Sequence, residues 1–438
     1  MKGAAAIGAL AAAVVSATAI PLLVSLVARQ FLVDNPNLRS SHRIPRARGG
    51  GLGILFGLCG GILVTSVFGQ VLTRPSLLVM IAALALGLMG LWDDLKHLPV
   101  LPRLLFQLGV AWGTAVFVGS VPRLPLPPPL DLPLGWLAVP LTVLWLVSVT
   151  NFFNFMDGID GLAGGQAIAT STAVILAGWG SDATAIAGIL IGATAGFLAY
   201  NWPPARIFLG DVGSLPVGFL LAALPLLAPP ERRPYALLAT AVSLSLFLLD
   251  PAVTLLRLVR LKHRLGQPHR QHAYQRLLLP GKTHRPVTVA LVVAGFGLSA
   301  LGAFAYRAGW AWWPALAIGA VAYLLEHRIA ARRESRRATA PPLSGFEPVP
   351  GSSLDDVETP EDAILLKASW TPFAVINSSR ALRYATFIAI DAAFTAGALY
   401  LAFILRFDGR IPPEHVVKLV ASLPILVVVR VAVNIVFG

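Results

Sequence analysis

Charged residues are scarce in this sequence: Asp, Glu, Lys and Arg together make up 13% of its 438 residues, against 56% hydrophobic residues. Soluble domains carry charge at about 25% of positions, so a soluble single-core protein is excluded. The hydrophobic residues instead form runs of about 20, the length that a helix needs to cross ~30 Å of hydrocarbon. Because these runs are continuous and do not alternate, they predict spanning helices and an all-α integral membrane fold.

Other absences exclude further classes of protein. The single cysteine, Cys59, cannot form a disulfide within the chain. There is no complete Gly-x-x-x-x-Gly-Lys-Ser/Thr phosphate loop to indicate ATP hydrolysis, and no repeat of fixed period to support a solenoid. The net charge of +13 is spread over short loops and forms no basic domain, so nucleic acid is not an expected partner.

Eleven candidate spans are expected, separated by polar loops. They cover residues 4–28, 50–70, 76–92, 104–120, 134–151, 163–180, 184–200, 214–229, 235–256, 287–306 and 310–326. The first has the basic start of a signal peptide, but its apolar stretch is too long and lacks a clear cleavage site, so it is expected to remain as a span. Residues 1–330 are therefore predicted to form one polytopic helical bundle.

Basic residues are divided unequally between the loops on the two sides of the membrane. One side receives Arg39, Arg43, Arg46, Arg48, Lys96, Arg103, Arg206 and the basic stretches 257–285 and 328–337, whereas the other receives Arg74, Arg123, Arg232, Arg233 and Arg307. This excess marks the first side as cytoplasmic and places the N-terminus on the periplasmic side. Every loop rich in Asp, Asn or His lies on the same cytoplasmic side.

The composition changes near residue 331. Residues 331–379 become rich in Pro, Ser, Glu and Asp, which predicts a flexible cytoplasmic linker. Two more apolar runs follow, near 382–405 and 415–436, and predict a small membrane module of two spans over residues 380–438.

An acid pair ends the third candidate span, in the sequence Asp93-Asp94-Leu95-Lys96. Two adjacent carboxylates at a membrane boundary lose hydration and repel each other, so a cation, a proton or Lys96 is expected to compensate them. A solvated helix end is the alternative interpretation.

Two further loops offer oxygen ligands. On a helix Asn154 would share a face with Asp157, and Asp157 with Asp160. Asp211 stands between two glycines at the start of the eighth span. Such oxygens suit Mg²⁺, which takes one or two protein ligands beside a substrate phosphate. The alternatives are an Asx-rich capping turn in the first loop and a helix cap by Asp211.

A cationic cluster, His269, Arg270 and His272, lies in the longest inner loop. Such donors suit a pyrophosphate. A Zn²⁺ site would need more ligands, and a basic loop held at anionic lipid headgroups is the third interpretation. In the first inner loop, Arg48-Gly49-Gly50 could cradle an anion with its side chain and backbone N–H groups.

The ordered set of motifs resembles that of the polyprenyl-phosphate N-acetylhexosamine-1-phosphate transferases. This family includes the undecaprenyl-phosphate GlcNAc-1-phosphate transferases and the phospho-MurNAc-pentapeptide translocases. The resemblance covers residues 1–330 and rests on Arg39-Ser40-Ser41-His42, Arg48-Gly49-Gly50, Asp93-Asp94-Leu95-Lys96, Asn154 to Gly161, Gly210 to Ser214 and the histidine loop. That loop, with its sequence His269-Arg270-Gln271-His272-Ala273-Tyr274, departs from the three-histidine pattern of many members and is similar to the O-antigen-initiating branch.

The resemblance implies transfer of an N-acetylamino-sugar-1-phosphate from a UDP-sugar to undecaprenyl phosphate, releasing UMP, at the cytoplasmic face of a bacterial inner membrane. It implies Mg²⁺, with Mn²⁺ as the alternative, held by Asp211 and Asn154. The remaining roles follow by the same analogy: Asp93 or Asp94 orients or deprotonates the lipid phosphate, Lys96 neutralises phosphate, Asp157 and Asp160 shape the nucleotide pocket, and His269, Arg270 and His272 hold the pyrophosphate.

The tail resembles a different family. Its sequence Leu405-Arg406-Phe407-Asp408-Gly409 is similar to the first spans of membrane-anchored nucleotide-sugar dehydratases and epimerases. Because no convincing Gly-x-Gly-x-x-Gly fingerprint is present, dehydratase activity is not expected. The two extra spans suggest a polysaccharide-assembly partner, and a homodimer is the other association considered. The rival function is that of a membrane transporter or an inactive phosphate-binding scaffold. A transporter would place ionisable residues near mid-membrane, whereas these cluster at one surface.

Overall fold

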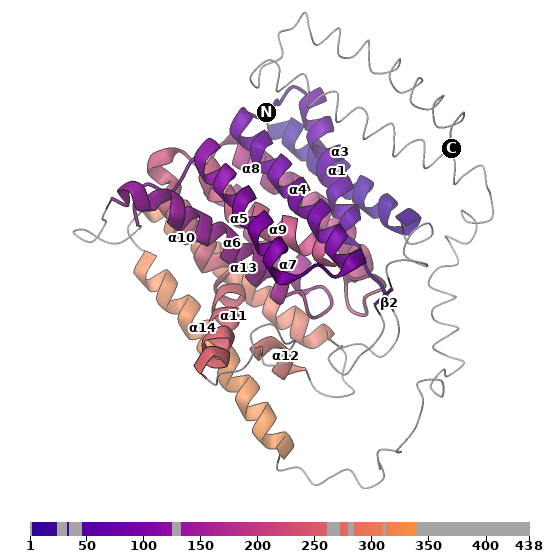
Figure 1. The fold of residues 1–438 in the computed structure, drawn as a ribbon, viewed down its shortest axis with the longest axis vertical. Helices are drawn as coiled ribbons and strands as arrows, with labels where there is room; N and C mark the ends of the chain where they lie inside the picture. Colours follow the sequence, from indigo (N-terminus) through magenta and orange to yellow (C-terminus); the bar gives the residue numbers. More distant parts are fainter. Residues whose placement is uncertain are drawn as a thin grey trace, which may run out of the picture.

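The computed structural model describes residues 2–23, 33–34, 46–124, 133–260, 272–278, 284–309 and 312–338. Within these ranges the regular structure is helical, apart from one short antiparallel pair formed by β1 (Val33–Asp34) and β2 (Arg46–Ala47). The helices lie side by side in one bundle, and α14 is a long helix at its edge (Figure 1). The predicted all-α membrane fold is confirmed.

The long helices follow the predicted spans in order. They are α1 (Lys2–Leu23), α3 (Gly51–Val67), α4 (Arg74–Lys96), α5 (Val100–Phe117), α6 (Ala138–Phe155), α7 (Leu162–Ala177), α8 (Ser181–Asn201), α9 (Asp211–Ala223), α10 (Arg233–Ser243), α11 (Ser245–Arg260), α13 (Arg285–Ala308) and α14 (Trp312–Ala338). A short helix, α12 (Ala273–Leu277), lies between α11 and α13 in the chain.

Six of the described helices are long and apolar enough to cross a membrane. The segments Asp211–Leu227 and Pro230–Ser243 add a seventh if this pair, bent by 117°, is counted as one span. Two further apolar helices, α3 and α7, have 17 and 16 residues and are shorter than a full crossing requires. The chain is thus a multi-pass membrane protein, although fewer described helices meet the length criterion than the eleven spans expected.

The ninth predicted span, residues 235–256, is not continuous. It is divided into α10 and α11 at Leu244, so the single-helix prediction was wrong at this point. The hydroxyls of Ser243 and Ser245 donate to the carbonyls of Ala239 and Val242, and such back-bonding competes with the helical ladder. Gln166 of α7 donates to the Ser243 carbonyl at the break, at 2.8 Å, and so satisfies an acceptor that would otherwise be buried alone.

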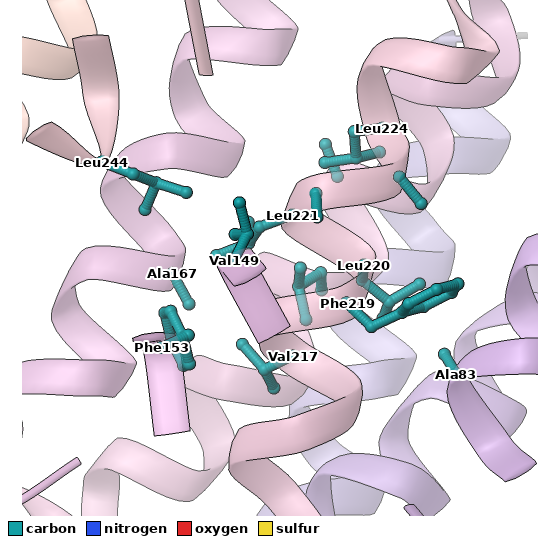
Figure 2. Close-up of a cluster of buried hydrophobic side chains, with 14 of the residues drawn as sticks. Ala83, Val149, Phe153, Ala167, Val217, Phe219, Leu220, Leu221, Leu224 and Leu244 are labelled. Atoms are coloured by element: carbon teal, nitrogen blue, oxygen red, sulfur yellow. The ribbon is translucent and has the colours of Figure 1, made fainter. Parts of the chain in front are cut away.

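The buried helix α9 occupies the centre of the bundle, packed against α4 and α6. Every residue from Val212 to Ala223 is buried. Figure 2 shows Val217, Phe219 and Leu220 of this helix among the buried side chains that surround it. Because α9 begins at Asp211, the packing of its apolar residues fixes where that carboxylate lies.

Small residues allow α1 to pack closely on α3 and α8. A Cβ atom added at Gly192 of α8 would lie 1.9 Å from the Ala9 carbonyl oxygen of α1. In a membrane, where lipid tails are as apolar as leucine, this close van der Waals contact between helices is a main source of their association.

The boundary of the predicted linker also changes. Helix α14 continues to Ala338, so the beginning of the range 331–379 is helical. The rest of that range and the predicted two-span module, residues 380–438, lie outside the described residues.

Candidate active site

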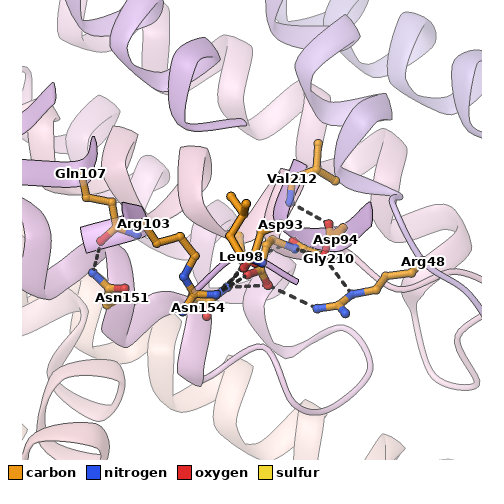
Figure 3. A network of polar contacts seen from close by, with 12 residues as sticks. Arg48, Asp93, Asp94, Leu98, Arg103, Gln107, Asn151, Asn154, Gly210 and Val212 are labelled. Atoms are coloured by element: carbon orange, nitrogen blue, oxygen red, sulfur yellow. Dashed lines mark hydrogen bonds and ion pairs between the residues drawn. The ribbon is translucent and has the colours of Figure 1, made fainter. Parts of the chain in front are cut away.

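Polar residues from five segments of the bundle converge at the ends of their helices. The C-terminal end of α4, the start of α5, the end of α6, the start of α9 and the residues after β2 each contribute a side chain (Figure 3). The network contains three carboxylates, Asp93, Asp94 and Asp211, and two guanidinium groups, Arg48 and Arg103. When all five groups are ionised, carboxylates exceed guanidinium groups by one, and a further cation would favour that ionised state.

Asp94 has a structural role in this network. Its side chain is 1% exposed, and its two oxygens accept the N–H groups of Asp211 and Val212, at 3.1 and 3.0 Å. Asp94 of α4 therefore caps the N-terminus of α9, where backbone N–H groups lack helical partners and a negative charge is stabilised. Nearby, a Cβ atom at Gly90 would lie 2.3 Å from the Asp211 carbonyl oxygen, so this glycine permits the close contact between α4 and α9.

Asp93 and Asp211 share one cation. Atom Nη1 of Arg103 contacts Oδ2 of Asp93 and lies 3.5 Å from Oδ2 of Asp211. The other oxygen of Asp93 accepts the N–H of Leu98 at 2.7 Å. From the sequence, Arg103 was only one of several loop charges, and no role in the site was predicted for it. Both carboxylates thus face the same positive group.

Arg48 joins the loop that precedes α3 to the same network. Its Nε lies 3.1 Å from Oδ1 of Asp94, and its Nη2 lies 3.3 Å from Oδ1 of Asp211. The expected anion cradle is only partly available, because the N–H of Gly50 donates to the carbonyl of Phe208 at 2.8 Å. Gly49, with φ of +96°, provides the turn that precedes this contact. The motif thus fixes this loop against the segment before α9.

Asn154 lies beside Asp211, as expected if both residues hold the same metal ion. Its amide nitrogen donates to Oδ1 of Asp211 at 3.0 Å and to the hydroxyl of Ser214 at 2.7 Å. Lys96 differs from the expectation: its residue is exposed, and among the described residues its side chain forms no ion pair with the acid pair. Arg48 and Arg103 take the neutralising positions that were assigned to Lys96.

Comparison with known proteins connects this site to a family. The sequence model of glycosyl transferase family 4 matches residues 76–228. A probable undecaprenyl-phosphate N-acetylglucosaminyl 1-phosphate transferase of Bacillus subtilis (strain 168) is 32% identical over 285 residues, which are 63% of this chain and 78% of that protein. A decaprenyl-phosphate N-acetylglucosaminephosphotransferase of Mycobacterium tuberculosis (strain ATCC 25618 / H37Rv) is 32% identical over 336 residues, 67% of this chain and 80% of that protein.

A phospho-N-acetylmuramoyl-pentapeptide-transferase of Synechococcus sp. (strain JA-2-3B'a(2-13)) is 34% identical over 262 residues, which are 54% of this chain and 71% of that protein. The chain belongs to the polyprenyl-phosphate sugar-1-phosphate transferase family. The resemblance inferred from the motifs is confirmed at this level.

In this transferase, Asp157 lies in the turn between α6 and α7, outside the spanning helices. Its side chain keeps some solvent exposure, yet the surrounding protein raises the pKa of its carboxyl well above the usual value, chiefly through loss of hydration. Arg48 opposes this shift, whereas the charges of Asp211 and Asp94 add to it. Asp157 therefore lies within the electrostatic reach of the network.

Asp160 connects three parts of the transferase. Its Oδ2 accepts the N–H of Ala205 at 2.9 Å, and its Oδ1 lies 3.2 Å from Nδ1 of His284. Its backbone carbonyl accepts the hydroxyl of Thr288, at the start of α13, at 2.7 Å. The nucleotide-pocket role expected of Asp160 stays a prediction, and the contacts show how it holds the loops around the site together.

His269 and Arg270 lie outside the described residues. His272 is described and buried, 3.4 Å from Asp250 of α11. Its predicted contact with a pyrophosphate stays a prediction.

Proposed function

We propose that the protein transfers an N-acetylamino-sugar-1-phosphate from a UDP-sugar to undecaprenyl phosphate, giving a lipid pyrophosphoryl sugar and UMP. The names of the Bacillus and Mycobacterium relatives, which specify undecaprenyl or decaprenyl phosphate and N-acetylglucosamine, support this reaction and favour UDP-GlcNAc as donor. We further propose that it initiates a cell-surface polysaccharide such as O-antigen, in a bacterial inner membrane, with its site on the cytoplasmic side and its N-terminus in the periplasm.

The observation that carries the proposal is the convergence of Asp93 and Asp211 on one positive charge, that of Arg103. Hard carboxylate oxygens that face a single cation are the donors that Mg²⁺ or Mn²⁺ would use. Among the described residues no group of three or more His, Cys, Asp and Glu could hold a metal. Mg²⁺ needs no such group, because it commonly takes one or two carboxylates and completes its shell with water and substrate phosphate.

The residues present therefore fit Mg²⁺, with Asp211 as the principal ligand and Asn154 and Asp93 as candidates beside it. Asn154 would have to offer its amide oxygen in place of the nitrogen that now donates to Asp211. When bound, Mg²⁺ would stabilise negative charge on the phosphate oxygens.

The position of α5 supports a lipid acceptor. Several large apolar side chains of this helix are exposed on the bundle surface: Val100, Leu101, Leu104, Leu105, Leu108 and Trp112. The same helix carries Arg103 at its inner end. A polyprenyl chain could therefore lie along an apolar surface while its phosphate reaches the charged network.

In the proposed reaction an oxygen of the acceptor phosphate attacks the β-phosphorus of the UDP-sugar. The new P–O bond replaces the bond between that phosphorus and the bridging oxygen, which leaves with UMP and its electron pair. Asp93 would orient the acceptor phosphate, while Arg48 and Arg103 would offset the charges of the phosphates. Asp94 would act indirectly, since its oxygens hold the start of α9 and thus the position of Asp211.

The direct test is UMP release by purified protein with undecaprenyl phosphate, Mg²⁺ and a panel of UDP-N-acetyl sugars. Release that requires the lipid and is abolished by EDTA would support the proposal, and comparison of the donors would identify the sugar. If no UMP forms with any donor tested, the proposed activity is wrong.

The companion variant is Asp211→Asn, which keeps the side-chain shape and removes its charge. We expect turnover to fall at least 100-fold, roughly the loss of a principal electrostatic contact in catalysis, with the helical content unchanged. Asp182→Asn is the matched control, because that carboxylate contacts Thr73 and Ser76 at the start of α4, far along the helix from Asp93. Near-normal turnover of Asp211→Asn would remove Asp211 from the metal site.

A further inference from the structure

Asp250 of α11 is a buried carboxylate that the proposed reaction does not use. Its residue is 0% exposed. Its Oδ1 accepts the hydroxyl of Thr254 at 3.1 Å and the N–H of Ala273 at 2.9 Å, and its Oδ2 accepts the N–H of Tyr274 at 3.2 Å. Burying a carboxylate is costly, and these three donors offset part of that cost. The buried carboxylate of Asp250 therefore depends on these three donors, and two of them are backbone N–H groups of α12.

The two backbone donors are the first two N–H groups of α12, so Asp250 ties the beginning of that helix to α11. The same Oδ1 atom lies 3.4 Å from Nδ1 of His272, the residue just before α12. In the sequence, residues 261–271 join the end of α11 to His272. Asp250 thus fixes the position of the chain at His272, which follows the segment that contains His269 and Arg270 in the sequence.

Tyr274 extends this connection to the turn that carries Asp157. Its ring stacks on that of His272, with centroids 5.7 Å apart, and its residue is wholly buried. Its hydroxyl donates to the Phe155 carbonyl at 3.0 Å. A Cβ atom at Gly158 would lie only 2.0 Å from that hydroxyl, so the ring and the turn are in close contact.

We propose that Asp250 is a positioning residue that fixes His272, and through Tyr274 the turn of residues 155–158, in a single arrangement for a nucleoside-diphosphate donor. The use of that arrangement rests on the proposed function. The arrangement itself rests on the contacts of Asp250 and Tyr274. Asp250 touches neither reactant, so its effect on the reaction is indirect.

The first experiment measures amide hydrogen exchange in Asp250→Ala. Ala273 and Tyr274 lose the acceptor of their N–H groups in this variant, so exchange over residues 273–277 should accelerate by roughly tenfold or more. Asp182→Ala is the matched control, since Asp182 likewise accepts a backbone N–H, that of Thr73, and side-chain hydroxyls, those of Thr73 and Ser76 among them, but at the start of α4. Its exchange over residues 273–277 should equal that of the wild type.

The second experiment separates binding from turnover. In Asp250→Ala the KM for the UDP-sugar should rise about tenfold with kcat changed less than about threefold, because a misplaced α12 weakens donor binding in the ground state and the transition state alike. The Asp182→Ala control should leave both constants near their wild-type values.

Asp250→Asn provides the conservative variant, and it is the fallback if Asp250→Ala does not fold. Asparagine keeps one oxygen for Ala273 but turns an N–H group toward the Tyr274 N–H, so its exchange and KM should lie between those of wild type and Asp250→Ala. The inference is overturned if exchange over residues 273–277 matches that of the Asp182 control. If wild-type protein transfers no sugar, the proposed function fails, and the exchange experiment still decides whether Asp250 holds α12.

Discussion

Replacing Arg103 with alanine tests whether one guanidinium group stabilises the carboxylate network. The variant removes the positive group between Asp93 and Asp211 and leaves two carboxylates that repel each other. Removing one partner of a buried ion pair costs about 3–5 kcal/mol. The Arg103 side chain is 26% exposed, however, so solvent screens part of the loss. We therefore expect a cost of about 2–3 kcal/mol, near the range of hydrogen bonds to charged groups.

Thermal unfolding in detergent measures this cost, and the ten tryptophans supply a fluorescence signal. At about 2.1 cal/mol/K per residue, unfolding a chain of 438 residues carries an entropy on the order of 0.9 kcal/mol/K, so a loss of about 2–3 kcal/mol should lower the Tm of Arg103→Ala by roughly 2–3 °C without Mg²⁺. Arg206→Ala is the control, because Arg206 is an exposed cation on the same side of the bundle. Exposed substitutions usually stay within about 0.5 kcal/mol, so its Tm should change by no more than about 0.5 °C.

Mg²⁺ gives the experiment a second, independent outcome. A divalent cation would supply the positive charge that the variant lacks, so saturating Mg²⁺ should raise the Tm of Arg103→Ala more than that of wild type. Samples treated with EDTA, which removes divalent cations, would provide the reference Tm values. Equal melting of the Arg103 and Arg206 variants, or an equal Mg²⁺ effect in wild type and Arg103→Ala, would refute the proposed neutralising role of Arg103.

Two glycines give further predictions. Gly210→Ala should lower stability by about 1–3 kcal/mol in thermal melts and reduce kcat, because its φ is +74° and its Cβ would lie 2.7 Å from Oδ2 of Asp94. Gly178→Ala is the control, because Gly178 has a similar φ of +73° but no atom within 4 Å of the added Cβ atom, so this variant shows the cost of backbone strain alone. An equal loss of stability in the two variants would refute a steric clash at Gly210. Gly158→Ala should cost about 1–3 kcal/mol through its collision with Tyr274, and adding Tyr274→Phe should recover part of it. If the stability losses of Gly158→Ala and Tyr274→Phe simply add in the double variant, as measured by thermal melting, the contact between these two residues is contradicted.

Hydropathy predicted the order of the helices because each apolar run carries its own signal for spanning a membrane. It missed the break at Leu244, where the run stays apolar while the serine hydroxyls of Ser243 and Ser245 bond to the backbone. Such a break depends on a compensating donor, Gln166, whose position in the sequence lies 77 residues away. Local composition contains no information about that partner.

The polar residues of the site show the same limit. The acid-rich loops predicted that Asp94, Asn154 and Asp211 would lie together, and in the structure Asp211 contacts the other two residues. Lys96 looked like the natural partner of the acid pair because it is close in sequence, but it is exposed at the last residue of α4, and Arg48 forms the ion pair with Asp94. Arg103 takes the neutralising position instead, and its contact with Asp211 spans 108 residues. Proximity in sequence identified the acids, whereas only the packing of α4, α5 and α9 identified their cations.

Asp93 and Asp94, the two acids of the pair, contact different groups, and this difference indicates different roles. Asp94 is bound by two backbone N–H groups and by Arg48, so replacing it would move the start of α9. Asp93 accepts a backbone N–H with one oxygen and directs the other to a side-chain cation that it shares with Asp211. A side-chain cation can be displaced by a substrate or a metal ion at far less cost than the end of a buried helix. We therefore propose that Asp93 is the acid of the pair that exchanges partners during the reaction, while Asp94 keeps Asp211 in place.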